Sequence, residues 1–154
     1  MFPSLRGLAQ IPGSSIVQPS MFNRRVRDPF GPALGGDHHT WNEHTQKRVF
    51  RYPQHLGSAW CDYGNDRQGI ALEGRHQDFS IMDFFVHLVV EKSRDPVRRT
   101  LDLCTVHPRR IRPGEEWSSP PVHIVVHQGD WHVVAARHRD WLRTWVRMPK
   151  SAPM

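Results

Sequence analysis

The stretch that decides the fold is VHIVVH at residues 122–127, followed by QGD at 128–130 and WHVVAAR at 131–137. Both outer runs are rich in valine, and the short segment between them contains Gly129. Two β-prone runs that flank a tight glycine-containing turn are typical of a β-hairpin. The sequence therefore predicts a hairpin from Val122 to Arg137.

The two faces of this predicted hairpin differ in polarity. One face is wholly apolar and carries Val122, Ile124, Val126, Trp131, Val133 and Ala135. The other is mixed and carries His123, Val125, His127, His132 and Val134. Because antiparallel sheets commonly bury one face and leave the other in water, we expect the apolar face to be buried. His127 would then lie opposite His132, or opposite Asp130 in the other register; either pair suits acid–base chemistry, but a solvated sheet face is the simpler interpretation.

Upstream of the hairpin, shorter patterns predict further strands. The candidates are Lys47 to Tyr52, Gln68 to Glu73, Phe79 to Glu91 and Val97 to His107. A turn is expected at residues 93–96 and a loop at residues 108–121, because proline, glycine and aspartate are concentrated there.

Downstream of the hairpin, the spacing of apolar residues changes to that of a helix. One side of this helix carries His138, Trp141, Leu142, Trp145, Val146 and Met148, and the other carries Arg139, Arg143 and Arg147. This pattern predicts an amphipathic helix from Arg137 to Arg147, ended by Pro149, whose apolar side covers the sheet. The expected fold class is α+β: a mostly antiparallel sheet of four to six strands, one C-terminal amphipathic helix and a long irregular N-terminal arm.

The predicted division of the chain is an extended arm over residues 1–40, a single β-rich domain over 41–148 and a tail over 149–154. The arm contains four arginines and no acidic residue before Asp28, a composition that favours either an organellar transit peptide or a partner-bound tail. Its prolines and glycines oppose a long helix. Such a segment has too little apolar surface to offset its own backbone entropy, so we expect it to lie on a partner.

Composition narrows the class of protein further. Lys and Arg number 21 against 15 Asp and Glu, which gives a net charge of +6 and favours an acidic protein surface or nucleic acid as partner. No apolar run approaches the length of about 20 residues that a membrane helix needs, although peripheral membrane contact stays open. Cys61 and Cys104 are the only cysteines; we expect two reduced thiols, with a single bridge as the alternative.

The best metal candidates are the histidines of the segment at residues 37–44, namely His38, His39 and His44, with Asp37 and Glu43 beside them. These are the residue types that bind zinc, but their spacing matches no standard zinc motif. Motifs for nucleotide binding and for an activated serine are also missing from the sequence. We therefore expect no catalytic residue, no cofactor and no small-molecule substrate.

The resulting hypothesis is a non-catalytic accessory subunit of a large multi-protein assembly, with a mitochondrial complex (respiratory chain or ATP synthase) as the first choice. An RNA-bound ribosomal-type subunit or a virion structural protein is the alternative, and a small His-dependent metalloenzyme is the second alternative. The partners are expected to be other protein subunits, with nucleic acid left open. The candidate partner-binding residues are Arg6, Arg24, Arg25, Arg27, Arg139, Arg143 and Arg147.

Overall fold

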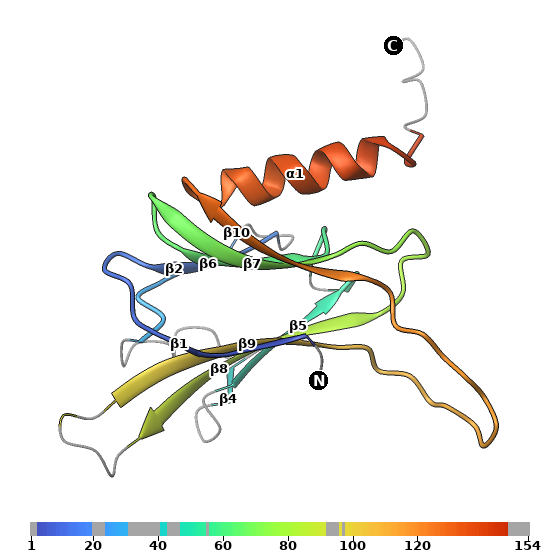
Figure 1. The fold of residues 1–154 in the computed structure, drawn as a ribbon, viewed down its shortest axis with the longest axis horizontal. Helices are drawn as coiled ribbons and strands as arrows, with labels where there is room; N and C mark the ends of the chain where they lie inside the picture. Colours follow the sequence, from blue (N-terminus) through green and yellow to red (C-terminus); the bar gives the residue numbers. More distant parts are fainter. Residues whose placement is uncertain are drawn as a thin grey trace.

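The computed structural model describes residues 3–19, 24–30, 41–42, 47–54, 56–91, 96 and 98–147. Within these ranges the chain forms two five-stranded antiparallel sheets that face each other, with one helix on the outer side of the second sheet (Figure 1). The prediction of a mostly antiparallel fold with one C-terminal helix is therefore confirmed. The number of strands is larger than expected, because the chain builds two sheets instead of one.

Sheet 1 has the strand order β1-β9-β8-β5-β4. Its strands are β1 (Ser4–Leu8), β4 (Trp41–Asn42), β5 (Lys47–Tyr52), β8 (Met82–Glu91) and β9 (Arg98–Val106). Sheet 2 has the order β10-β7-β6-β2-β3. Its strands are β2 (Ser15–Gln18), β3 (Arg24–Arg27), β6 (Trp60–Gly64), β7 (Gln68–Gly74) and β10 (Val122–Gln128).

The main core fills the space between the two sheets. Sheet 1 contributes buried side chains such as Phe84 and Leu103, and sheet 2 contributes others such as Tyr63 and Leu72. Side chains on one face of a strand recur at every second residue, which places these groups on the facing sides of the sheets. Full burial of each large apolar side chain stabilises the fold by about 1.5–3 kcal/mol. Cys61 and Cys104 are both buried, and their thiols are not joined in a disulfide.

Helix α1 (His132–Arg143) packs on the outer face of sheet 2. Its buried residues Val134 and His138 are four apart and therefore share one face of the helix. Val134 belongs to a second, smaller core on that outer face, which includes Trp60 of β6 and Val125 of β10. No helix among the described residues is long and apolar enough to cross a membrane.

The predicted hairpin is wrong in its second half, because residues 132–137 are helical and β10 pairs with β7 instead. Asp130 forms the turn before the N-cap residue Trp131: its carboxylate accepts a hydrogen bond from the His132 N–H at 3.0 Å, and its carbonyl accepts one from the Val133 N–H at 3.1 Å. The β propensity of Val133 and Val134 is overridden by packing, since the helix places Val134 in the smaller core and His138 against Glu73 of β7. The helix also begins five residues before the predicted position and ends at Arg143.

The prediction of which face of β10 is buried is wrong as well. Val125 and His127 are buried, whereas Ile124 and Val126 are 51% and 78% exposed. Helix α1 covers the face that carries Val125. A prediction that makes residues 131–137 a strand has no helix there to cover this face. Ile124 and Val126 are on the same side as Leu72 and Ile70 of β7, but at the edge of sheet 2, where neither sheet 1 nor the helix covers them.

The described part of residues 1–40 is not an irregular arm. It provides β1 at one edge of sheet 1, and β2 and β3 in sheet 2, where β2 lies between β6 and β3. All four residues of β2 are buried, and the hydroxyl of Tyr63 donates to the carbonyl of Ala9 at 2.8 Å. The surface that orders this segment is thus the chain's own pair of sheets. Residues 31–40 and the tail at 149–154 lie outside the described residues.

Candidate functional site

A surface hollow of about 410 Å³ opens on the outer face of sheet 2, beside the start of α1. Its walls come from the end of β2, from β3, from β6 and from the segment that leads into α1. The lining residues are Val17, Gln18, Pro19, Arg25, Trp60, Asp130, Trp131 and His132. The rings of Trp60, Trp131 and His132 stack in series, with centroid separations of 6.2 Å and 3.8 Å.

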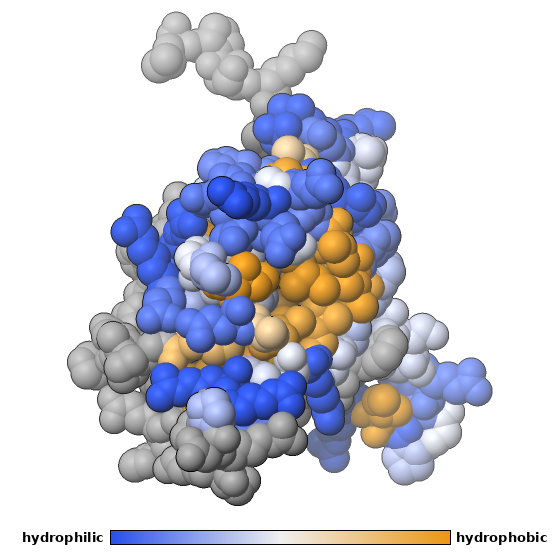
Figure 2. All heavy atoms as spheres, turned by 60° about the vertical axis from the view of Figure 1, so that its left-hand side comes forward, coloured by the Kyte–Doolittle hydropathy of each residue, from blue (hydrophilic) through white to orange (hydrophobic). Residues whose placement is uncertain are grey.

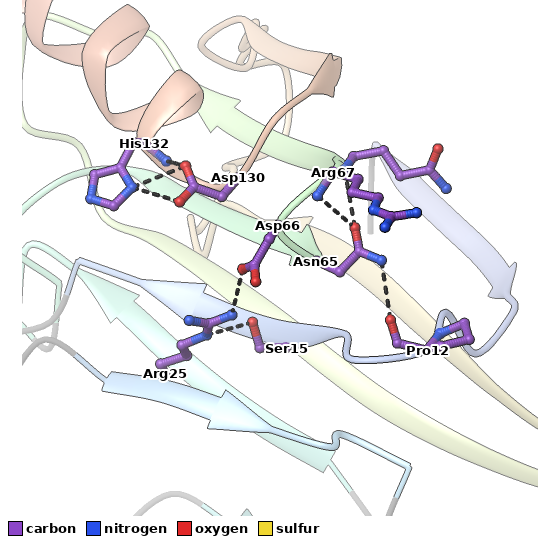
Figure 3. A network of polar contacts seen from close by, with 9 residues as sticks. Pro12, Ser15, Arg25, Asn65, Asp66, Arg67, Asp130 and His132 are labelled. Atoms are coloured by element: carbon purple, nitrogen blue, oxygen red, sulfur yellow. Dashed lines mark hydrogen bonds and ion pairs between the residues drawn. The ribbon is translucent and has the colours of Figure 1, made fainter.

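Asp130 and His132 form an exposed ion pair at the rim of this hollow (Figure 3). The Nδ1 atom of His132 lies 2.9 Å from each carboxylate oxygen of Asp130. This hydrogen bond holds the pKa of Asp130 below its usual value. An imidazole held in this way by a carboxylate can exchange a proton at its other nitrogen, but none of the residues that line the hollow is a serine, cysteine or lysine nucleophile.

Arg25 of β3 faces this pair from the other side of the hollow (Figure 3). Its Nε donates to the Ser15 hydroxyl at 2.9 Å, and its Nη2 lies 3.3 Å from a carboxylate oxygen of Asp66. The guanidinium is thus held by the β6–β7 turn. Its positive charge is balanced locally by Asp66 and Asp130, so the hollow offers no strong binding site for an anion.

A second aspartate–histidine pair lies buried on the same face of sheet 2. The Nε2 atom of His127 lies 2.8 Å from Oδ1 of Asp62, and both side chains are 3% exposed. Burial raises the pKa of Asp62, and the hydrogen bond with His127 offsets part of that rise. Gly69 leaves room for the imidazole, since a Cβ there would come within 2.6 Å of Nε2. The pair thus links β6 to β10 beneath α1, with both side chains shielded from solvent.

A buried carboxylate fixes the far part of α1 to sheet 2. Glu73 of β7 is fully buried and contacts His138 at 3.2 Å, Arg75 at 3.2 Å and Arg137 at 3.1 Å. Burial would raise the pKa of Glu73, but hydrogen bonds from His138, Arg75 and Arg137 outweigh it and lower that pKa to about 2. Arg137 and His138 belong to the helix, so this ionised group ties α1 to β7.

The open edge of β10 is the other feature with functional potential. Sheet edges expose unpaired backbone groups, and proteins usually protect them with charged side chains, bulges or very short strands. Three of the four edges described here follow that rule. Strand β1 carries a register shift between Leu5 and Leu8, β3 has the sequence RRVR, and β4 is described over two residues only.

Strand β10 has none of these protections. Its sequence VHIVVHQ contains no charged residue and no proline, and its register with β7 runs unbroken from Val122 to Gln128. The exposed side chains of Ile124 and Val126 lie directly on this edge strand. Figure 2 shows apolar surface gathered on one side of the molecule and bordered by hydrophilic side chains.

The predicted site residues are dispersed. Arg6 lies in β1, Arg24, Arg25 and Arg27 in β3, Arg139 and Arg143 in α1, and Arg147 beyond the end of α1. Arg25 alone among them lines the hollow beside α1, while Arg25 and Arg27 line a second hollow of about 580 Å³ next to residues 10–14. His38, His39 and His44 lie outside the described residues, and within the described part of the chain no three metal-binding side chains converge.

Sequence reasoning missed the buried acids Asp62 and Glu73. Each stands in a short strand without another charged residue, WCDYG and QGIALEG, and each is paired with a histidine. An acidic residue inside such a strand is the signal that could have identified them, because buried carboxylates need a partner. The histidines that pair with these two acids, His127 and His138, both lie in residues 122–138.

Comparison of the chain with protein-family models, with curated proteins and with solved structures gives no match.

Proposed function

We propose that this chain is a non-catalytic subunit of a protein assembly and that the edge of β10 is its assembly contact. One observation carries the proposal: β10 is a seven-residue edge strand with apolar, exposed side chains and without any protection against pairing. A regular, uncharged edge of this kind is a template for strand addition by another chain. The described part of the N-terminal segment pairs with other strands of the same chain. The proposed contact is therefore the edge of β10 and not this segment.

The arginines give weaker support to the RNA-bound alternative. Arg139 and Arg143 share Asp140 as an ionic partner, and Arg25 is held by Asp66. These arginines lie on different elements and are partly neutralised by neighbouring acids. Sequence-independent RNA binding is expected to need a concentrated positive surface instead.

The exposed Asp130–His132 pair gives some support to a catalytic alternative. Such a pair activates a nucleophile in many enzymes, but catalysis also needs donors that stabilise developing charge. Arg25 is the one arginine or lysine among the residues that line the hollow, and its guanidinium is already engaged by Ser15 and Asp66. The geometry thus favours binding through the strand edge over chemistry in the hollow.

The native size of the chain tests the proposal. An affinity-tagged copy is expressed in its source cells, and the extract is separated by size under non-denaturing conditions. We expect the wild-type chain in particles well above its own mass of 17.9 kDa. Val126→Lys should release the chain to the monomer position, because the exposed charge disfavours strand addition.

Ile111→Lys is the matched control, since Ile111 is an exposed apolar residue outside the strands and the charge change is the same. It should leave the particles intact. The proposal fails if the wild-type chain migrates as a monomer, or if Val126→Lys and wild type migrate alike.

A further inference from the structure

We infer that the partner of the β10 edge is a second copy of this chain, paired antiparallel about a two-fold axis at Val125. This inference rests on the proposed function, because it uses the same edge and names the partner. It joins two copies of sheet 2 into one continuous ten-stranded sheet. Three features of β10 carry it: the direction of its free backbone groups, the symmetry of its sequence, and its lack of charge.

The ladder with β7 fixes which backbone groups of β10 are free. The Arg75 N–H donates to the Pro121 carbonyl, and the Gly129 N–H donates to the Arg67 carbonyl, so residues 121 and 129 face β7. Residues of an antiparallel strand alternate between facing one neighbour and facing the other. Among the described residues, the N–H and C=O groups that no other residue pairs on the open edge are therefore those of Val122, Ile124, Val126 and Gln128.

These four residues are arranged symmetrically about Val125. A two-fold axis there places Val122 opposite Gln128 of the second copy, and Ile124 opposite Val126 of the second copy. Every free N–H of the edge then meets a free C=O, so the free groups of both strands are satisfied without a change of register. An axis between two residues would put side chains from opposite faces against each other, which the strand pleat forbids.

The side chains follow the same symmetry. The sequence VHIVVHQ reads nearly the same in both directions from Val125, with Ile124 matched by Val126 and His123 by His127. Cross-strand Ile–Val pairs lie within contact distance on a shared face. The pairing would therefore cover the two apolar side chains that β10 leaves exposed.

Charge selects this edge for self-association. Each copy carries a net charge of +6, so two copies repel each other over most approaches. Self-pairing of β3 would bring the arginines of RRVR against one another, whereas β10 contributes no charged group. Among the described edge strands longer than two residues, β10 is thus the one that carries no charged side chain.

The test measures the mass of the purified full chain by sedimentation across a range of micromolar concentrations. We expect a mass near twice the 17.9 kDa of one chain. Val126→Pro leaves the hydrogen bonds to β7 intact, because β7 does not use the Val126 N–H, and it should weaken the dimer by about tenfold or more. Val126→Lys provides a second disruption, Ile111→Lys is the control, and circular dichroism confirms that each variant is folded.

Cross-linking tests the register. Ile124→Cys and Val126→Cys chains, mixed under oxidising conditions, should form a mixed disulfide, because those positions face each other in this pairing. Either variant alone should cross-link poorly, since identical positions are then diagonal neighbours about 7–8 Å apart. Cys61 and Cys104 are buried and should not compete.

The inference is overturned if the purified chain is monomeric, if Val126→Pro and Val126→Lys dimerise as the wild type does, or if the single-variant samples cross-link as well as the mixture. If the purified chain is monomeric but the particles in extracts still depend on Val126, the inference is overturned and the proposed function stands. A Val126→Lys chain that behaves as wild type in both settings would overturn both.

Discussion

The imidazole of His127 and the carboxylate of Asp62 lie 2.8 Å apart with both side chains almost fully buried, so each is the other's partner on the outer face of sheet 2. Removing one member leaves the other buried and unpaired, which is costlier than removing both. We expect Asp62→Ala to lower the free energy of unfolding by about 3 kcal/mol. The double variant with His127→Ala should lose clearly less than the two single losses added together. Urea denaturation measures all three, and additive losses would contradict a paired role.

Gly69→Ala should disrupt the His127–Asp62 pair by placing a methyl group against it. The added Cβ would lie 2.6 Å from Nε2 of His127 and 3.1 Å from Oδ1 of Asp62, and neither buried side chain has room to move. We expect a loss of about 2 kcal/mol or more in the free energy of unfolding. Gly57→Ala is the control, because its Cβ would meet only the Pro19 carbonyl at an ordinary 3.5 Å. A similar stability for the two variants would show that His127 can move aside.

Glu73 should make the stability of the fold sensitive to acid. Its pKa of about 2 in the folded chain is below its ordinary value of 4.5, so the unfolded chain binds the proton more readily. The stabilisation is therefore present above pH 4.5 and is lost as the pH falls towards 2; it amounts to at most about 3 kcal/mol. Glu73→Gln should flatten stability against pH over this interval, whereas the exposed Glu116→Gln should not. An unchanged slope for Glu73→Gln would refute the assignment.

His76 should weaken the fold at mildly acidic pH. Burial lowers the pKa of His76, the nearby Asp78 partly opposes this, and His107 and His138 add to it. The unfolded chain therefore takes up a proton first, and stability falls as the pH drops below about 6.5. His76→Phe keeps a ring against Tyr52, whose centroid is 5.3 Å away, and should reduce the loss of stability between pH 7.5 and about 5. Urea midpoints at the two pH values measure this, and an equal loss in both proteins would contradict it.

The sequence predicted much of sheet 1 and part of sheet 2, because β5, β7, β8 and β9 alternate clearly or carry dense β-branched and aromatic residues. It failed where local preference and packing disagree. Val133 and Val134 favour a strand, yet the helix is stabilised by contacts with β6 and β7 that lie some 60 residues earlier. Strand β10 pairs with β7 and not with residues 131–137, and this pairing follows from the same long-range contacts.

The candidate site was less predictable than the fold. Arg25 was identified as a partner-binding residue, but its position in the hollow depends on a salt bridge with Asp66, far away in sequence. The edge of β10 could not be recognised before the helix was placed, because an edge is a property of the whole sheet. The sequence shows an apolar face with Ile124 and Val126, which predicts burial, whereas at the edge of the sheet these two side chains are exposed.

The pairing of β1 with β9 has a consequence for synthesis. Ser4 lies opposite Cys104, and the Gly7 N–H donates to Asp102, so β1 closes against a strand that is made nearly 100 residues later. At 5–20 residues per second that delay is roughly 5–20 s, during which Leu5 and Leu8 have no strand to lie against. During this interval β1 is without the strand that it pairs with, and a molecular chaperone has time to bind it.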